Sequence, residues 1–218
     1  MSIKMIQKGK NQAGFTMVEL MIATLVFSTV LVILTSGVIY FTNTYYKGIT
    51  LSTTQNTVRQ ITEDVSRAIQ FGGDKGPILS GSNDVKALCI GNKRYTYVLN
   101  KQVQDTPNAS QVYHALVVDK VSTCDAPIDQ FDEKNVAGSS VATTQELMGN
   151  RMRLVDFSIN STGGADNLYQ ITVAVAYGDD DLFTKLSDGS PNYRQCANGP
   201  GSHFCGTATL VTSVQKRV

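Results

Sequence analysis

The chain has 218 residues, 42% of them hydrophobic, and a formal net charge of +1, which predicts one domain of modest size with an appendage. Lys4, Lys8 and Lys10 lie in a leader without any acid, so the rest of the chain holds 16 basic residues against 18 acidic ones. This balance leaves no basic stripe and argues against nucleic acid as a main partner.

An apolar run dominates the amino-terminal end of the chain. Residues 15–41 contain a single charged residue, Glu19, and they are long enough to cross a hydrocarbon core of about 30 Å as a helix. No small-residue cleavage site follows the run, so we expect any processing to fall before it. The lysines of the leader predict that this end stays cytoplasmic, which places the remainder of the chain outside.

The helical pattern continues beyond the apolar run. No proline occurs between residues 15 and 71, and Gly72 and Gly73 then supply a stop, so we predict one helix up to that point, with Ser36-Gly37 as a candidate bend. Residues 42–71 are amphipathic, and their apolar face is expected to lie on the rest of the protein. This face consists of Leu51, Val58, Ile61, Val65, Ala68 and Ile69.

Strand signals fill the remainder of the chain. Short β-branched and aromatic segments alternate with Gly, Asn, Ser and Thr, which predicts an antiparallel meander. The expected strands are residues 86–90, 94–99, 112–121, 153–160, 168–177 and 207–215. Residues 72–83 have the composition of a turn, and residues 122–150 that of a long loop with a helical turn at 144–148. The predicted fold class is α+β, a long amino-terminal helix packed on an antiparallel sheet.

All four cysteines lie in the outward part of the chain, and an even number there predicts two disulfides. Three pairings are possible in principle. Cys196 and Cys205 flank one short glycine-rich loop and are the favoured pair, which leaves Cys89 for Cys124. A zinc site is the competing interpretation, but no two cysteines have the two-residue spacing that such sites use.

Two further groups of residues are candidates for metal binding or catalysis. Four carboxylates near the end of the chain form a weak calcium candidate, but their spacing is not that of an EF-hand, and a solvated turn is the simpler interpretation. They are Asp179, Asp180, Asp181 and Asp188. Neither His114 nor His203 lies near a nucleophile motif, so we expect no enzymatic activity and no cofactor.

The string GFTMVEL, residues 14–20, closely resembles the amino terminus of type IV prepilins and pseudopilins, because a short lysine-bearing leader precedes it and an apolar helix follows it. In that family, prepilin peptidase cleaves after the glycine that matches Gly14 and methylates the new first residue, here Phe15. The glutamate that matches Glu19 aids filament assembly. The resemblance implies a pilin-like lollipop with a leader (1–14), a transmembrane or filament-core half-helix (15–41), an amphipathic half-helix (42–71) and a disulfide-containing β-rich head (72–218).

The chemistry of Glu19 is consistent with this resemblance. Cleavage would create an α-amino cation at Phe15, and pairing with it would offset the cost of burying the acid. A pair between neighbouring subunits would set their axial register. The alternative is that Glu19 interacts only with the dipole of its own helix or with the amine of its own chain.

One departure from the family pattern narrows the interpretation. Major pilins commonly have a proline in the last third of the membrane helix, where this chain has Ser36. In this respect the chain resembles a minor pilin, or a minor pseudopilin of a type II secretion system. The resemblance implies prepilin peptidase, other pilins and a cytoplasmic-membrane assembly platform as partners. An alternative is a tip-located adhesin or DNA-capture module on a pilin helix, for which Lys93, Arg94 and Tyr95 form the one compact nucleic-acid candidate.

Overall fold

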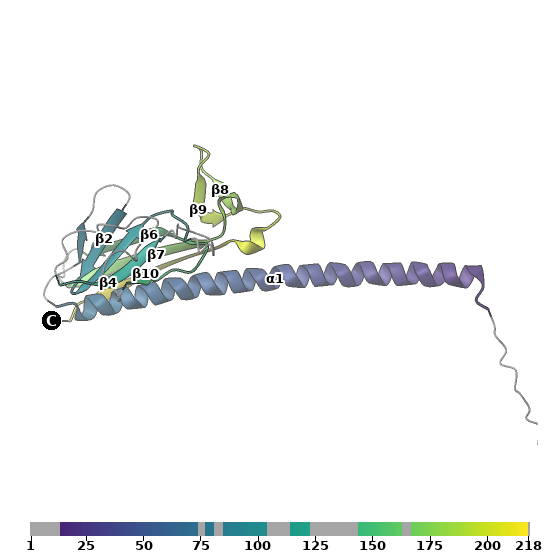
Figure 1. The fold of residues 1–218 in the computed structure, drawn as a ribbon, viewed down its shortest axis with the longest axis horizontal. Helices are drawn as coiled ribbons and strands as arrows, with labels where there is room; N and C mark the ends of the chain where they lie inside the picture. The colour runs from purple at the N-terminus through teal and green to yellow at the C-terminus, as the bar shows by residue number, and fades with distance from the viewer. Residues whose placement is uncertain are drawn as a thin grey trace, which may run out of the picture. The chain divides into compact units, whose positions relative to one another are not determined.

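The computed structural model describes residues 14–73, 77–80, 85–103, 114–122, 144–162 and 167–217. The leader before Gly14 and the predicted disulfide partner Cys124 lie outside these residues. The chain forms two compact units, Met1–Asn43 and Thr44–Val218. Helix α1, Met17–Phe71, contributes to both units (Figure 1).

In the first unit, every residue of the apolar run is exposed. The hydroxyl groups within the run are satisfied by the helix itself, since Ser28 Oγ donates to the Thr24 carbonyl oxygen (2.7 Å) and Ser36 Oγ to the Val32 carbonyl oxygen (2.8 Å). The Ser36-Gly37 pair is helical and interrupts no part of α1. The run therefore presents a continuous apolar surface that the described part of the chain does not cover.

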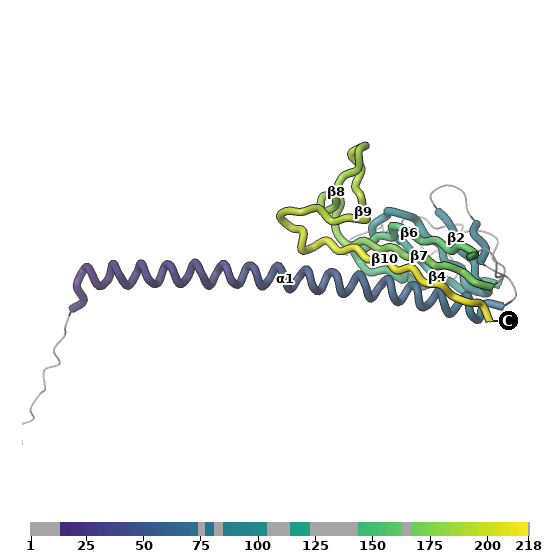
Figure 2. The backbone as a smooth tube through the Cα atoms, turned by 180° about the vertical axis from the view of Figure 1, so that it is seen from behind, coloured from purple at the N-terminus to yellow at the C-terminus, as the bar shows by residue number. Residues whose placement is uncertain are grey.

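The described residues of the second unit form three antiparallel sheets (Figures 1 and 2). The five-stranded sheet is a meander in the order β1 (Ile78–Ser80), β2 (Val85–Ile90), β3 (Lys93–Val98), β4 (Leu116–Lys120) and β5 (Gln145–Glu146). The three-stranded sheet has the order β10 (Gly206–Gln215), β7 (Leu168–Tyr177) and β6 (Met152–Ser161). A hairpin of β8 (Phe183–Lys185) and β9 (Pro191–Cys196) completes the set, with short 3-10 turns η2 (Asp180–Leu182) and η3 (Ser202–Phe204) beside it.

The core of the second unit forms where residues 44–71 of α1 pack on the sheets. The predicted apolar face is buried, with Val58, Ile61, Val65 and Ile69 at most 2% exposed, and each such side chain contributes about 1.5–3 kcal/mol by leaving water. These side chains join residues of both larger sheets in one cluster. The α+β class and the packing of the helix on antiparallel sheets are confirmed.

One part of the predicted helix face differs. Leu51 is only partly buried, and the buried side chains at this level are Thr50 and Thr54. The reason is the close approach of β10, which runs beside α1 in Figure 2. A Cβ on Gly206 would lie 3.0 Å from both Thr50 Cγ2 and Thr54 Oγ1. The small threonine side chains on α1 and the glycine on β10 leave room for this close approach.

The strands at 86–90, 94–99, 153–160, 168–177 and 207–215 are confirmed within one or two residues at each end. The helical turn at 144–148 is wrong, because this segment forms β5 and pairs with β4. The Glu146 carboxylate explains the difference. It accepts hydrogen bonds from the backbone N–H groups of Ala115, Leu116 and Met148, which hold the segment extended. Strands β1, β8 and β9 were not predicted.

Candidate functional site

Glu19 takes part in a capping box at the start of α1. The backbone N–H and the hydroxyl of Thr16 both donate to Glu19 Oε2 at 3.0 Å, and the Glu19 N–H donates to Thr16 Oγ1 at 3.3 Å. A threonine followed three residues later by a glutamate is the usual signature of this cap. The signature is present in the string TMVE, but only an ion pair or the helix dipole was considered for Glu19 from the sequence, and the cap was missed.

The three predicted site residues lie close together in sequence, beside the capping box. Gly14 and Phe15 precede the helix in non-helical backbone, Phe15 is 83% exposed, and the space around Gly14 is open. The peptide bond between them is therefore accessible to a protease. The Glu19 carboxylate accepts both Thr16 hydrogen bonds through Oε2, which holds it beside the residue that follows Phe15.

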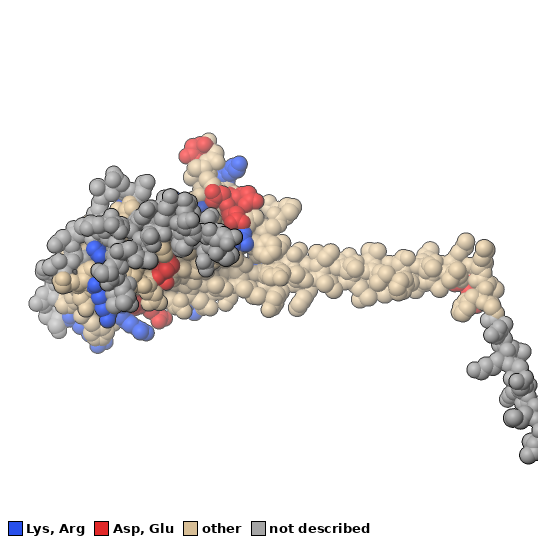
Figure 3. Space-filling view, viewed as in Figure 1, with Lys and Arg blue, Asp and Glu red and all other residues tan. Residues whose placement is uncertain are grey.

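Beyond the cap, the first half of α1 is uncharged and predominantly apolar. The segment from Leu20 to Tyr46 has no charged residue, and Figure 3 shows it in tan apart from a small acidic area near its beginning. It is the one helix in the described part of the chain that is long and apolar enough to cross a membrane. A contiguous exposed apolar surface of this size marks a membrane or protein interaction surface.

The comparison with family models agrees with this geometry. The model described as the prokaryotic N-terminal methylation motif matches residues 9–35. This motif is diagnostic of type IV pilins and pseudopilins. The amino-terminal segment of the chain therefore carries the motif of type IV pilins and pseudopilins, and this motif points to a structural protein. No curated protein and no solved structure matched the chain significantly.

The disulfide predicted between Cys196 and Cys205 is present, and the two residues are nine positions apart in sequence. Within the loop, Gly201 has φ of 84°, a left-handed conformation that glycine adopts at low cost. Cys89 is buried in β2 and is not a free thiol. Its proposed partner, Cys124, lies outside the described residues.

Removing this disulfide should loosen the end of the second unit. In the chain-entropy model, a loop of this length contributes about 2.7 kcal/mol, so the double variant Cys196→Ser/Cys205→Ser should be less stable by about that amount. Non-reducing peptide mapping of protein from the cell surface should recover the two cysteines in one linked peptide. Free thiols at both positions would contradict the pairing.

The four candidate calcium ligands are largely engaged with other groups. Asp179 accepts from Gln102 Nε2 (3.1 Å) and pairs with Arg151, while Asp180 accepts from Arg153 and from the Tyr193 hydroxyl. The hydrogen bond from Gln102, and after it the Arg151 cation, hold the pKa of Asp179 below its usual range. No group of three or more potential metal ligands was found among the described residues.

Asp188 has a local structural role in the β8–β9 turn. Its carboxylate accepts from the Ser190 N–H (2.9 Å) and hydroxyl (2.6 Å), and these bonds lower its pKa. An Asx-type turn of this kind explains the aspartate without a metal. The solvated-turn interpretation of the acidic loop is therefore the one that the described contacts favour.

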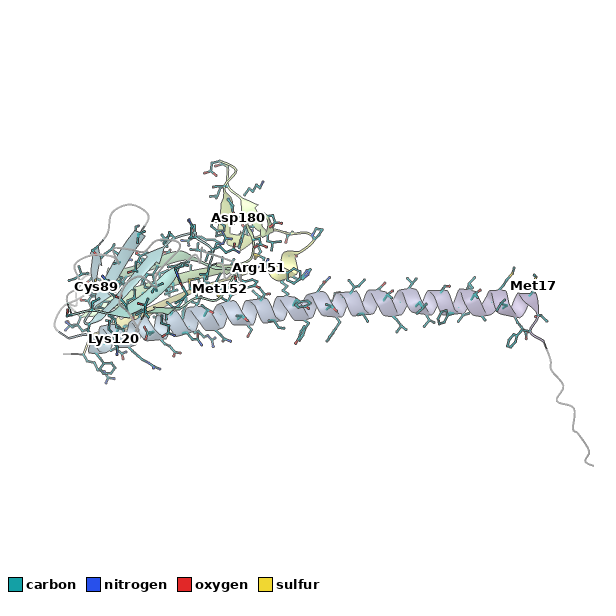
Figure 4. The ribbon with its side chains drawn as sticks, in the orientation of Figure 1. Met17, Cys89, Lys120, Arg151, Met152 and Asp180 are labelled. Carbon is teal, nitrogen blue, oxygen red and sulfur yellow. A yellow bond between two sulfur atoms is a disulfide. The ribbon has the colours of Figure 1, made fainter. Side chains whose placement is uncertain are left out.

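Arg153 anchors the β8–β9 hairpin to the three-stranded sheet and was not predicted to do so. It lies on β6, is 2% exposed, and donates to Asp180 (2.6 Å) and to the Gly178 carbonyl oxygen (2.9 Å). Its guanidinium lies 4.1 Å from the centre of the Tyr193 ring and 5.4 Å from that of Phe183. Figure 4 labels Asp180 beside this hairpin.

The candidate nucleic-acid site makes its contacts within the protein; it consists of Lys93, Arg94 and Tyr95. Lys93 Nζ donates to Asp64 of α1 (2.6 Å), and Arg94 pairs with the buried Asp119 (2.6 Å). Tyr95 is fully buried and donates to Asp64 (2.7 Å), and burial first, then this hydrogen bond, raise its pKa. Lys93 and Tyr95 attach β3 to α1 through Asp64, and Arg94 attaches β3 to β4 through Asp119, so all three side chains are engaged by carboxylates.

Proposed function

We propose that this protein is a minor pilin, a structural subunit of a type IV pilus or a related filament. The observation that carries the proposal is the exposed apolar half of α1 with a capped glutamate at its beginning. A helix of this kind requires a membrane before assembly and the helices of other subunits after it. The subunit is held in the cytoplasmic membrane with its amino terminus inside, and prepilin peptidase releases it from its leader.

The choice of a minor subunit is supported by Ser36. Serine keeps the backbone N–H that a proline would lack, so α1 continues without a break at this position, and the Ser36 hydroxyl also donates to the Val32 carbonyl oxygen (2.8 Å). The additional β8–β9 hairpin and the disulfide-closed loop also give the second unit features beyond a simple sheet on a helix. A minor pseudopilin of a type II secretion system would share all these properties.

A role as a DNA-capture module is not favoured. The residues that would bind DNA are each engaged by Asp64 or Asp119 inside the protein; they are Lys93, Arg94 and Tyr95.

A protein-binding or glycan-binding subunit at the filament tip would enter the filament through the same helix and would differ in its location. Immunogold labelling of purified filaments separates these cases, because a structural minor subunit is expected sparsely along the shaft, whereas a tip-located binding subunit is confined to the tip. Absence from filaments of cells that assemble them would contradict the proposal.

Processing gives the most direct test of the family-derived site. The mature protein should begin at Phe15 and carry an N-methyl group, because the accessible bond after Gly14 lies on the cytoplasmic side of the proposed membrane helix. Intact mass and amino-terminal peptide analysis of filament-bound protein would show the loss of residues 1–14 and the added methyl group. Filament-bound protein that still begins at Met1, or is cleaved beyond Phe41, would rule out this processing.

A further inference from the structure

Two segments that are distant in sequence form an exposed aromatic patch in the second unit. Tyr45, Tyr46 and Ile49 come from α1, and His203 and Phe204 come from the disulfide-closed loop; these five residues are called the aromatic patch below. The ring centres of Tyr46 and Phe204 are 5.4 Å apart, and those of His203 and Phe204 are 4.1 Å apart. Figure 1 shows the yellow η3 turn against α1.

The patch is a surface and not a part of the core. Tyr45 is 57% exposed, Ile49 45%, Tyr46 43% and Phe204 38%. Burial on α1 begins only at Thr50. The position of Phe204 is fixed, because its N–H donates to the Gly201 carbonyl oxygen (2.9 Å) and the next residue, Cys205, is disulfide-bonded. The loop therefore holds an apolar ring at the surface instead of folding it inward.

The place of the patch along the chain identifies what covers it. Residues 15–41 rise about 40 Å as a helix, close to the 40–45 Å of a bilayer with its headgroups. Tyr45 and Tyr46 follow four and five residues later in the same helix, at the outer headgroup level. Tyrosine prefers this level, since its ring is apolar and its hydroxyl polar. Lys47 adds a cation for anionic headgroups.

We propose that the aromatic patch binds the lipid surface of the outer leaflet, so that the disulfide-closed loop contacts headgroups while the subunit waits in the membrane. The inference rests on the proposed function, because it requires the apolar run to span the bilayer. It adds a second membrane contact to the subunit, made by the loop next to Cys205 as well as by the helix. This contact would orient the second unit on the membrane surface before assembly.

The absence of tryptophan from the sequence makes the inference directly testable. Full-length Phe204→Trp would be reconstituted in vesicles of phosphatidylethanolamine and phosphatidylglycerol, with or without lipids that carry a nitroxide on the headgroup. We expect nitroxide lipids to quench the indole emission strongly. The matched control is Val211→Trp, at a side chain that is 52% exposed on β10, and its emission should be almost unchanged.

A third variant separates this inference from the proposed function. Phe27→Trp lies within the apolar run and should be quenched by lipids brominated in the acyl chain. If it is not, the chain does not span the bilayer, and both the inference and the membrane-held pilin are overturned. If it is quenched while Phe204→Trp behaves like Val211→Trp, only the lipid contact is overturned.

A second copy of the protein is the competing occupant of the patch. Shielding of the Phe204→Trp indole from acrylamide that grows with protein density, without quenching by headgroup nitroxides, would overturn the lipid contact. Tyr46→Trp repeats the test from the helix side of the patch. Agreement between the two variants would exclude a local disturbance of the disulfide-closed loop as the cause of any signal.

Discussion

Glu19→Ala is expected to remain in the membrane and to be cleaved after Gly14, but to enter filaments poorly. Removal of a charge from an apolar helix favours insertion. In the filament, however, the amine of a neighbouring Phe15 would be buried without a counter-charge. Loss of one member of a buried ion pair costs about 3–5 kcal/mol, which corresponds to a fall in incorporation of roughly two orders of magnitude or more. The measurement is the ratio of filament-bound to membrane-bound protein, with processing followed in parallel.

The capping box requires controls that separate charge from helix capping. Glu19→Gln removes the charge, yet its amide oxygen can still accept from Thr16, so it should resemble Glu19→Ala if the charge matters. Thr16→Val keeps the carboxylate and removes the capping hydroxyl, at a cost of about 0.5–2 kcal/mol. It should assemble far better than either Glu19 variant. Equal incorporation of Glu19→Gln and wild type would show that the glutamate acts mainly as a cap.

The sequence was most informative where one local pattern determines the structure. The end of α1 follows from Gly72 and Gly73, and its buried face follows from an apolar repeat that begins at Val58. Strands β7 and β10 follow from long alternating segments. The capping box is equally local, because Thr16 and Glu19 need only each other; it was missed because only an ion pair or the helix dipole was considered for Glu19 from the sequence.

The features that could not be predicted depend on contacts between distant residues. Glu146 makes its segment extended through bonds to backbone groups about 30 residues earlier. Lys93 and Tyr95 appeared to be candidates for nucleic-acid binding, because nothing in the sequence connects them with Asp64. Strands β8 and β9 are short, and their position depends on Arg153, whose partners lie 25 to 40 residues away.

Arg153 is therefore the residue of the second unit whose replacement should have the largest local effect. Arg153→Met keeps a long side chain but leaves Asp180 and the Gly178 carbonyl oxygen without the guanidinium. Charge-assisted hydrogen bonds contribute about 1.5–3 kcal/mol, and the cation–π contacts with Tyr193 and Phe183 add about 1 kcal/mol. Asp180 is partly hydrated already, so the expected loss is about 3 kcal/mol and not a full buried-pair penalty.

The stability lost in Arg153→Met should appear first in the β8–β9 hairpin and only later in the rest of the second unit. Amide hydrogen exchange of residues 183–196 in the full chain should become about a hundredfold faster, while exchange in β2 and β3 should change little. Arg194→Met is the matched control, since Arg194 pairs with Asp156 (2.8 Å) but is 59% exposed. An exposed pair contributes about 0–1 kcal/mol, so the control should exchange almost like wild type. Equal exchange in both variants would mean that the Phe183 and Tyr193 rings and the disulfide hold the hairpin without Arg153.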